Sequence, residues 1–269
     1  MLVFPQLVTG ASALYPVTRQ SIQRTVVNTL GDGSTVVFAD PDAAATGWQL
    51  HASGMTLAEW NAIEALFLAA SGMWQTFTFL DPTGNLLADS ETLSGGAWTN
   101  GALIELTPAI ADPLGTTRAT RVINAGSAAE SVAQILSVPG NFQYCLSVWA
   151  RTSGTSGVTL TISTTGGSTV KSFALNGTWT RISVSGNLAQ STTSVTFGAQ
   201  LAAGASVDLF GMQVEAQPAA SDYKVTETQG GVYAKARFAQ DQLTVTAQST
   251  DVYDAVISIA VISTLDTEG

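Results

Sequence analysis

Two pairs of aromatic and basic side chains have a spacing that suits carbohydrate binding. Trp149 and Arg151 are two residues apart, as are Trp179 and Arg181, and both pairs lie in strand-like segments. Side chains at positions i and i+2 of a strand point to the same face. An indole ring beside a guanidinium group would stack a sugar ring and hold its hydroxyl groups. The alternative is that the tryptophans are core residues and the arginines lie at the rim, and we expect at least one tryptophan to be in the core.

Carboxylate pairs for glycan cleavage are not predicted. A glycosidase needs two carboxylates that face one cleft. Asp208 and Glu215 lie on one predicted strand, seven residues apart. An odd separation would place them on opposite faces of a regular strand. Asp251 and Asp254 lie at the edge of another predicted strand, where solvation explains them.

The sequence also contains no motif for metal binding or for nucleophilic catalysis. His51 is the only histidine and Cys145 the only cysteine. No G-x-S-x-G motif accompanies His51, so we expect a half-buried strand residue. A lone cysteine forms neither a disulfide framework nor a thiolate metal cluster. Asp40 and Asp42 are not followed by further calcium ligands. We therefore predict no catalytic residue, no metal and no cofactor, and hence no enzyme.

The composition indicates a folded, acidic chain. Of the 269 residues, 45% are hydrophobic and 11% charged, and the formal net charge is −10. Binding of nucleic acid by phosphate neutralisation needs clustered Lys and Arg, so we expect no specific nucleic-acid partner. A signal peptide begins with a basic region, but no basic residue precedes Arg19, so we expect no signal peptide. No apolar run approaches about 20 residues, so we expect no membrane insertion.

A helix is predicted from Thr56 to Ser71-Gly72. Thr56 and Glu59 have the spacing of a capping box, and glycine accepts the left-handed conformation that ends a helix. Between these ends apolar residues recur at helical spacing: Trp60, Ile63 and Phe67, with Leu57 and Leu66. A strand over Met73 to Leu80 and a surface turn over Asp81 to Asn85 should follow.

Strands are predicted on both sides of this helix. Gly31 to Ser34 contains an Asp-Gly pair typical of a hairpin turn, joining a strand over 21–30 to one over 35–38. Residues 40–42 should form a loop. The run over 252–262 is continuously apolar in its middle and predicts a strand buried on both faces.

Residues 88–224 have a different character, dense in Ser, Thr and Gly. Short alternating segments bounded by turn residues predict a two-sheet sandwich, most simply a jelly roll. The clearest strands cover 117–124, 131–138, 142–151, 158–164, 170–175, 179–184, 194–201 and 207–215.

The domain organisation follows from these patterns. The apolar strands of residues 225–269 need a sheet to join, so we expect them to complete the domain begun by residues 1–87. Residues 88–224 would then be an insertion at the Asp81–Asn85 turn. The fold class is thus mainly β: a mixed β domain with one short helix, carrying an inserted β-sandwich.

Two resemblances accompany this organisation. Trp48-Gln49-Leu50, Gly54-Met55-Thr56 and the run from Thr76 to Leu87 resemble the core domain of tailed-phage minor tail proteins, ring-forming parts of the distal tail or baseplate. The second resemblance covers roughly residues 90–224 and is to carbohydrate-binding jelly-roll modules carried by phage structural proteins. It rests on residues 144–151, 178–181, 210–215 and 221–223.

These resemblances imply a structural role. The chain would form a homo-oligomeric ring, for example a hexamer, at the virion tail tip, joining the tail tube to hub or fibre proteins after synthesis in the host cytoplasm. The jelly roll would project outward and contact a host-surface glycan. One alternative is a carbohydrate-binding adhesin; a weaker one is a glycan-cleaving enzyme.

Overall fold

The chain is mainly β and forms two compact units. The computed structural model describes residues 1–189 and 191–262, which contain sixteen strands and one helix. The first unit comprises Met1–Pro5, Ala13–Phe79 and Tyr233–Gly269. The second unit comprises Gln6–Ser12 and Leu80–Val232. The predicted fold class, a mixed β domain with one helix plus a β-sandwich, is confirmed.

Helix α1 (Leu57–Ala70) begins and ends where the sequence predicts. The Thr56 hydroxyl accepts a hydrogen bond from the Glu59 backbone N–H at 3.3 Å, and the Glu59 carboxylate accepts one from the Thr56 N–H at 2.8 Å. This capping box satisfies N–H groups that have no partner inside the helix. Ser71 takes the left-handed conformation at the C-terminal end. Of the predicted apolar stripe, Trp60, Ile63 and Leu66 are buried and Phe67 is half-buried, whereas Leu57 in the first turn is exposed.

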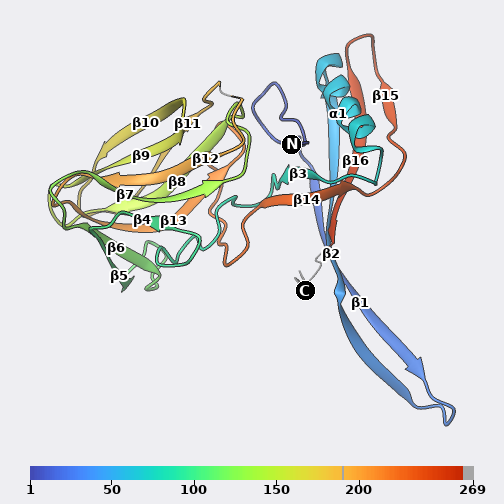
Figure 1. The fold of residues 1–269 in the computed structure, drawn as a ribbon, viewed down its shortest axis with the longest axis horizontal. Helices are drawn as coiled ribbons and strands as arrows, with labels where there is room; N and C mark the ends of the chain where they lie inside the picture. The colour runs from blue at the N-terminus through green and yellow to red at the C-terminus, as the bar shows by residue number, and fades with distance from the viewer. Residues whose placement is uncertain (190, 263–269) are drawn as a thin grey trace. The chain divides into compact units, whose positions relative to one another are not determined.

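The first unit is a sheet with α1 packed on one face (Figure 1). Among the described residues the strand order is β1 (Val17–Thr29), β2 (Thr35–Met55), β16 (Tyr253–Ile262), β14 (Val232–Phe238) and β3 (Phe77–Leu80), with β15 (Val245–Ala247) paired to β16. The core between helix and sheet includes Trp48, Leu50, Phe79 and Ile257. Segments from both ends of the chain thus build one sheet.

Strand β16 is buried on one face only, so the prediction of two buried faces is wrong. Ala255, Ile257 and Ile259 are in the core, whereas Val256 between them is 53% exposed. Val256 pairs with His51 of β2. Gln49 and Val256 are exposed and His51 is half-buried on this second face of the sheet, which we call the bare face.

Two local predictions are also corrected. Strand β3 begins at Phe77 rather than Met73, because the chain needs residues 71–75 to turn after α1. Residues 40–42 lie within strand β2 instead of forming a loop. The extra residues of β2 shift its register with β1, so that Ile22 pairs with Ala45 but Arg24 pairs with Asp40.

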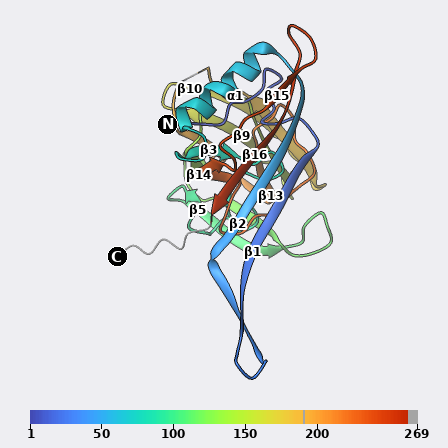
Figure 2. The ribbon, with the colours of Figure 1, turned by 90° about the vertical axis from the view of Figure 1, so that its right-hand side faces the viewer.

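Strands β1 and β2 continue beyond the sheet as a two-stranded ribbon, which we call the arm (residues 22–40). Figures 1 and 2 show it extending away from the other strands of the first unit. As predicted, its tip is a hairpin turn, in which the Asp32 side chain accepts a hydrogen bond from the Ser34 N–H at 2.9 Å. Residues 21–35 are all exposed.

The second unit is a sandwich of two antiparallel sheets. In the described part of the chain one sheet has the order β10 (Gly167–Ala174), β9 (Gly157–Thr164), β12 (Val195–Leu201), β7 (Glu130–Leu136) and β4 (Thr99–Asn100). The other has the order β11 (Thr180–Gly186), β8 (Tyr144–Arg151), β13 (Ser206–Glu215), β6 (Ala119–Asn124) and β5 (Ile104–Ile110). All eight predicted strands are present, and β4 and β5 are additional.

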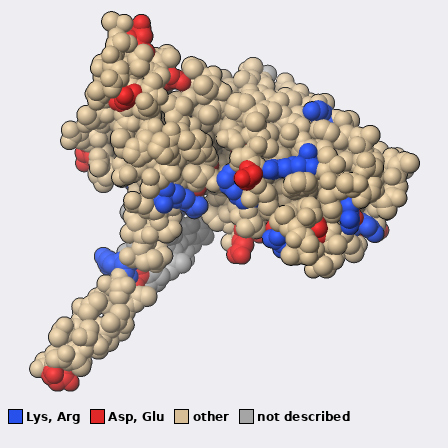
Figure 3. All heavy atoms as spheres, turned by 180° about the vertical axis from the view of Figure 1, so that it is seen from behind, with Lys and Arg blue, Asp and Glu red and all other residues tan. Residues whose placement is uncertain are grey.

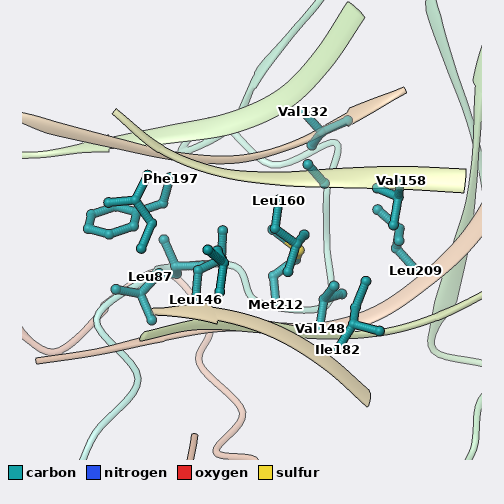
Figure 4. Close-up of a cluster of buried hydrophobic side chains, with 14 of the residues drawn as sticks. Leu87, Val132, Leu146, Val148, Val158, Leu160, Ile182, Phe197, Leu209 and Met212 are labelled. Atoms are coloured by element: carbon teal, nitrogen blue, oxygen red, sulfur yellow. The ribbon is translucent and has the colours of Figure 1, made fainter. Parts of the chain in front are cut away.

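Alternate side chains of both sheets fill the space between them. Figure 4 shows Leu160 and Phe197 from one sheet facing Leu146, Val148 and Met212 from the other. The Ser and Thr residues that alternate with these side chains lie largely on the outer surfaces. Because of this alternation, the strands of the jelly roll could be predicted from the sequence.

The boundaries between the units differ from the expected ones. Residues 80–87 and 225–232 belong to the second unit. Leu86 and Leu87 are in the jelly-roll core, and the fully buried Asn85 side chain donates to the Met212 carbonyl at 2.8 Å. The expected surface turn over 81–85 is therefore anchored, with Asp81 and Asn85 buried.

Candidate carbohydrate-binding face

All four predicted sugar-binding residues lie on one surface of the jelly roll. On β8, Leu146, Val148 and Ala150 point into the core, so Trp149 and Arg151 point away from it. We call this side of the β11-β8-β13-β6-β5 sheet the outer face. Both tryptophans are half-buried and neither belongs to a core cluster. The expectation that at least one would be a core residue is wrong.

The four residues pair across strands rather than along them. Trp149 of β8 lies opposite Arg181 of β11. The Arg151 guanidinium carbon lies 4.6 Å from the centre of the Trp179 ring, a cation–π contact. Trp179 immediately precedes β11, which begins at Thr180. The structure therefore brings the four residues together, with each indole next to the arginine of the other strand.

A buried carboxylate holds two arginines on this face. Asp208 is 2% exposed and accepts from Arg121 through both carboxylate oxygens, at 2.7 and 3.2 Å. It also accepts from Arg151 Nε at 3.0 Å, and Arg151 Nη2 donates to the Ala111 carbonyl at 3.2 Å. The hydrogen bond and the negative charge of Asp208 raise the pKa of the Arg121 guanidinium. Arg151 is thus fixed in place over Trp179.

Arg181 is similarly engaged. Its Nη1 donates to the Ser221 carbonyl at 2.5 Å, and its Nη2 donates to the Ser147 hydroxyl at 3.1 Å. Among the described residues, the buried Arg181 Nε and the buried Trp179 Nε1 have no hydrogen-bond partner. Each of the two arginines thus gives two of its five N–H donors to the protein, and the partly exposed indole rings lie beside them as groups that a ligand would contact.

A β-bulge overturns the prediction that Asp208 and Glu215 lie on opposite faces. Strand β13 pairs with β8 through Phe210 opposite Trp149 and then Gln213 opposite Ser147, so β13 has one extra residue. This shift brings Asp208 and Glu215 to the same outer face. Their partners on β8 are Arg151 and Cys145, which at about 3.3 Å per residue separates them by roughly 20 Å. Glycosidase carboxylates lie only about 5–10 Å apart.

Glu215 is buried and its carboxylate is hydrogen-bonded by neighbouring residues. It is 4% exposed and accepts from the Ser221 N–H at 2.9 Å and from Lys224 Nζ at 3.1 Å. Burial alone would raise the pKa of Glu215, but the hydrogen bonds from Ser221 outweigh it and the pKa is lowered. Burial, assisted by the Glu215 charge, raises the pKa of the Cys145 thiol to about 11. Neither group is poised for proton transfer near neutral pH.

Sequence inspection missed a hollow beside β5 and β6. It measures about 360 Å³ and combines Glu91 and Arg118, paired at 2.9 Å, with the hydroxyl groups of Thr92, Ser94, Thr117 and Thr120. The Arg118 guanidinium also lies 5.3 Å from the centre of the Phe210 ring. Glu91 and Arg118 are distant in sequence, so no spacing could have indicated them. These groups would hydrogen-bond a polyol.

The remaining candidates lie outside this face. His51 is half-buried on β2, as predicted. The Asp254 carboxylate accepts from the Gly54 N–H at 2.8 Å and from Gln248 at 2.7 Å. Among the described residues, no three or more His, Cys, Asp or Glu side chains are grouped to hold a metal ion, and no helix there is long and apolar enough to cross a membrane.

Comparison with known proteins gives structural neighbours only. No family model and no curated protein sequence matches the chain. The neighbours include the Clostridium thermocellum xylanase 10B CBM22-1–GH10 modules, at 18% identity and a TM-score of 0.40, covering 53% of this chain and 29% of that one. TmCBM61 in complex with β-1,4-galactotriose has 14% identity and a TM-score of 0.38, covering 48% and 97%. Bacteriophage CBA120 tailspike protein 4 has 12% identity and a TM-score of 0.40, covering 51% and 22%.

Proposed function

We propose that this protein is a structural component of the tail tip of a tailed phage or related particle, where it assembles into a ring that joins the tail tube to hub or fibre proteins. The observation that carries this proposal is the arm. The resemblance of residues 48–50, 54–56 and 76–87 to minor tail proteins also supports a role in the tail tip. No catalytic activity is proposed.

The arm exposes apolar side chains on both of its faces. Val26 pairs with Phe38 and Val27 pairs with Val37, and neighbouring pairs along a ribbon point to opposite sides. Val27, Val37 and Phe38 are 58, 61 and 53% exposed. An isolated two-stranded ribbon is at best marginally stable in water. A partner that covers both faces would stabilise the arm, and a neighbouring copy in a ring supplies one.

The charge distribution suits close approach between acidic copies. Figure 3 shows charged atoms on the arm only at its tip and at one point along its length. Arg24 and Asp40 form an ion pair there, and Asp32 lies in the tip turn. The intervening ribbon is neutral, so it can be buried against another acidic chain without placing like charges together.

Shortening the arm tests this proposal. Thr25 and Ala39 are paired, so residues 26–38 can be replaced by Asn-Gly to make a two-residue hairpin. Light scattering should find a discrete oligomer for the full chain and a monomer for the shortened variant, with thermal unfolding of the jelly roll unchanged. As a matched control, Ile135→Ser, at an exposed position of the second unit, should leave assembly intact. A full chain that stays monomeric at every concentration, alone and with tail proteins, would overturn the proposal.

We further propose that the jelly roll contacts a host-surface glycan through its outer face. The position of Trp149 and Trp179 outside the core favours this contact. Binding to a panel of immobilised glycans should be lost in Trp149→Ala and Trp179→Ala and retained in Leu114→Ala, which truncates an exposed side chain elsewhere. Equal binding by all of these proteins would place the contact elsewhere, and the hollow at Glu91 and Arg118 would be tested next.

A further inference from the structure

A rigid turn after α1 presents an exposed tryptophan. Trp74 is 72% exposed, and Met73 beside it is 43% exposed. Leu68, in the last turn of α1, is 69% exposed. We call these three residues the knob. The backbone joins them, because the Ser71 N–H donates to the Leu68 carbonyl and the Trp74 N–H to the Ser71 carbonyl. Several large exposed apolar side chains in one short segment mark an interaction site more often than a single exposed residue does.

The turn that carries the knob is fixed on both sides of its backbone. Asp241 accepts a hydrogen bond from the Met73 N–H at 2.8 Å, and Arg237 Nη1 donates to the Met73 carbonyl at 3.2 Å. Gly72 has φ +65°, and a Cβ there would lie 2.4 Å from Asp241 Oδ1. Little backbone conformational entropy is therefore lost when the knob binds a partner, which favours affinity.

A pocket on the bare face of the same unit has a size and a lining that suit the side chains of the knob. It has a volume of about 410 Å³ and is lined by Tyr15, Pro16 and Val256, with His51, Thr246 and Asp254 as polar groups. An apolar cavity of about 150 Å³ is enough to hold a benzene ring, so this pocket has room for an indole and a neighbouring side chain. The polar groups offer acceptors for the indole N–H.

One pair of opposite charges is available between the two surfaces. Arg237 lies at the knob through its contact with the Met73 carbonyl, next to the Asp241 carboxylate that accepts from the Met73 N–H, and Asp254 lies in the pocket. Hydrogen bonds from the Gly54 N–H and from Gln248 lower the pKa of Asp254, so it is anionic at neutral pH. A guanidinium arriving with the knob would meet a carboxylate.

We propose that the knob of one copy inserts into the bare-face pocket of the next copy. This inference rests on the proposed ring and specifies one of its contacts. The two surfaces are different parts of the first unit, and Trp74 is too exposed to occupy its own pocket. A contact between different surfaces is heterologous, and heterologous contacts close into rings or extend into filaments. The occupant of the pocket is therefore a second copy of this chain.

Cysteine cross-linking between copies tests the contact directly. Met73→Cys and Ser53→Cys place thiols beside Trp74 and at the pocket, which Ser53 lines, while keeping Trp74 and Val256. After mild oxidation, a mixture of the two full-length variants should form disulfide-linked dimers, and each variant alone should not. The native Cys145 is buried and should stay silent.

A second measurement keeps the two proposals distinguishable. Trp74→Ser should raise the dissociation constant of the oligomer by at least about tenfold, and Leu114→Ser should not. If oligomers form but the mixture does not cross-link, or if Met73→Cys cross-links equally well alone, the knob contact is wrong and the ring proposal stands. If no oligomers form, both are wrong.

Discussion

At the scale of single residues, the outer face of the jelly roll depends on Asp208. Its carboxylate is buried and joins Arg121 on β6 to Arg151 on β8, and Arg151 in turn covers Trp179. One anion therefore fixes the positions of three side chains on a surface that sequence spacing could only suggest. The partners of Asp208 are distant in the chain, so this arrangement was not predictable from the sequence.

Removing the Asp208 carboxylate should destabilise the second unit. Asp208→Ala leaves two guanidinium groups, 38 and 26% exposed, without their partner. Because solvent screens both, we expect a loss of about 2–3 kcal/mol in the free energy of unfolding. Urea unfolding measures this loss. Glu105→Gln, at an exposed position on β5, is the control and should change stability by less than about 0.5 kcal/mol; an equal effect in both variants would contradict the assigned role.

Asp112 should make stability depend on pH in the acid range. Burial alone would raise its pKa, but hydrogen bonds from Thr116, Arg118 and Leu114 outweigh this and lower the pKa from 3.8 to about 2. A lowered folded-state pKa stabilises the fold above about pH 4, and this contribution is lost as the pH falls through about 2. Wild type should therefore melt higher than Asp112→Asn at pH 6, and the gap should narrow toward pH 2. A constant gap would show that the charge is not the cause.

Truncating the outer-face tryptophans should affect stability moderately. Trp149→Ala and Trp179→Ala remove half-buried rings, and the second also removes the contact with Arg151. We expect each to lower the free energy of unfolding by about 1–2 kcal/mol. Phe197→Ala, a truncation in the core, should lower it by about 3–5 kcal/mol. Losses as large as that of Phe197→Ala would restore the core interpretation.

At the scale of elements, one glycine in β13 decides which side chains share a face. Gly211 has φ +66° at the bulge, and an added Cβ would lie 3.0 Å from the Tyr223 ring. Without this extra residue, Asp208 and Glu215 would point in opposite directions. The bulge thus builds the outer face by changing the alternation of a strand.

A pair of glycine substitutions separates backbone strain from steric contact. Gly204 also has a positive φ, +69°, but nothing lies near its missing Cβ. Gly204→Ala should lower the free energy of unfolding by about 1–2 kcal/mol through backbone strain alone. Gly211→Ala should lower it further, because the Tyr223 ring must also move. Equal melting temperatures for the two variants would show that Tyr223 adapts freely.

Local rules explain which elements were predictable. Three features depend only on residues close together in the sequence and could therefore be predicted: the capping box at Thr56, the Asp-Gly turn of the arm and the alternating strands of the jelly roll. The bulge at Gly211 was missed because one glycine in an alternating strand resembles an ordinary small residue. The exposure of Val256 was missed because an apolar run does not state whether a second layer covers it. Spacing predicted that each of the two tryptophans shares a strand face with the arginine two residues later, but the pairing across strands depends on register.

At the scale of the whole molecule, the two units have different surfaces. The second unit carries 10 acidic and 6 basic residues, whereas the first unit carries 10 and 4. The first unit has an arm with only three charged residues, a bare sheet face and an exposed knob. We propose that an assembly buries these features. The second unit buries its apolar strands within its own sandwich. We therefore propose that assembly uses the first unit and that glycan contact uses the second.

Electron microscopy of the purified full-length protein at high concentration would show whether the first unit assembles into a ring. We predict closed rings with a constant number of subunits for the full-length protein, and the loss of these rings when residues 26–38 are replaced by Asn-Gly. Isolated monomers in both samples, with tail proteins present as well as absent, would contradict this prediction.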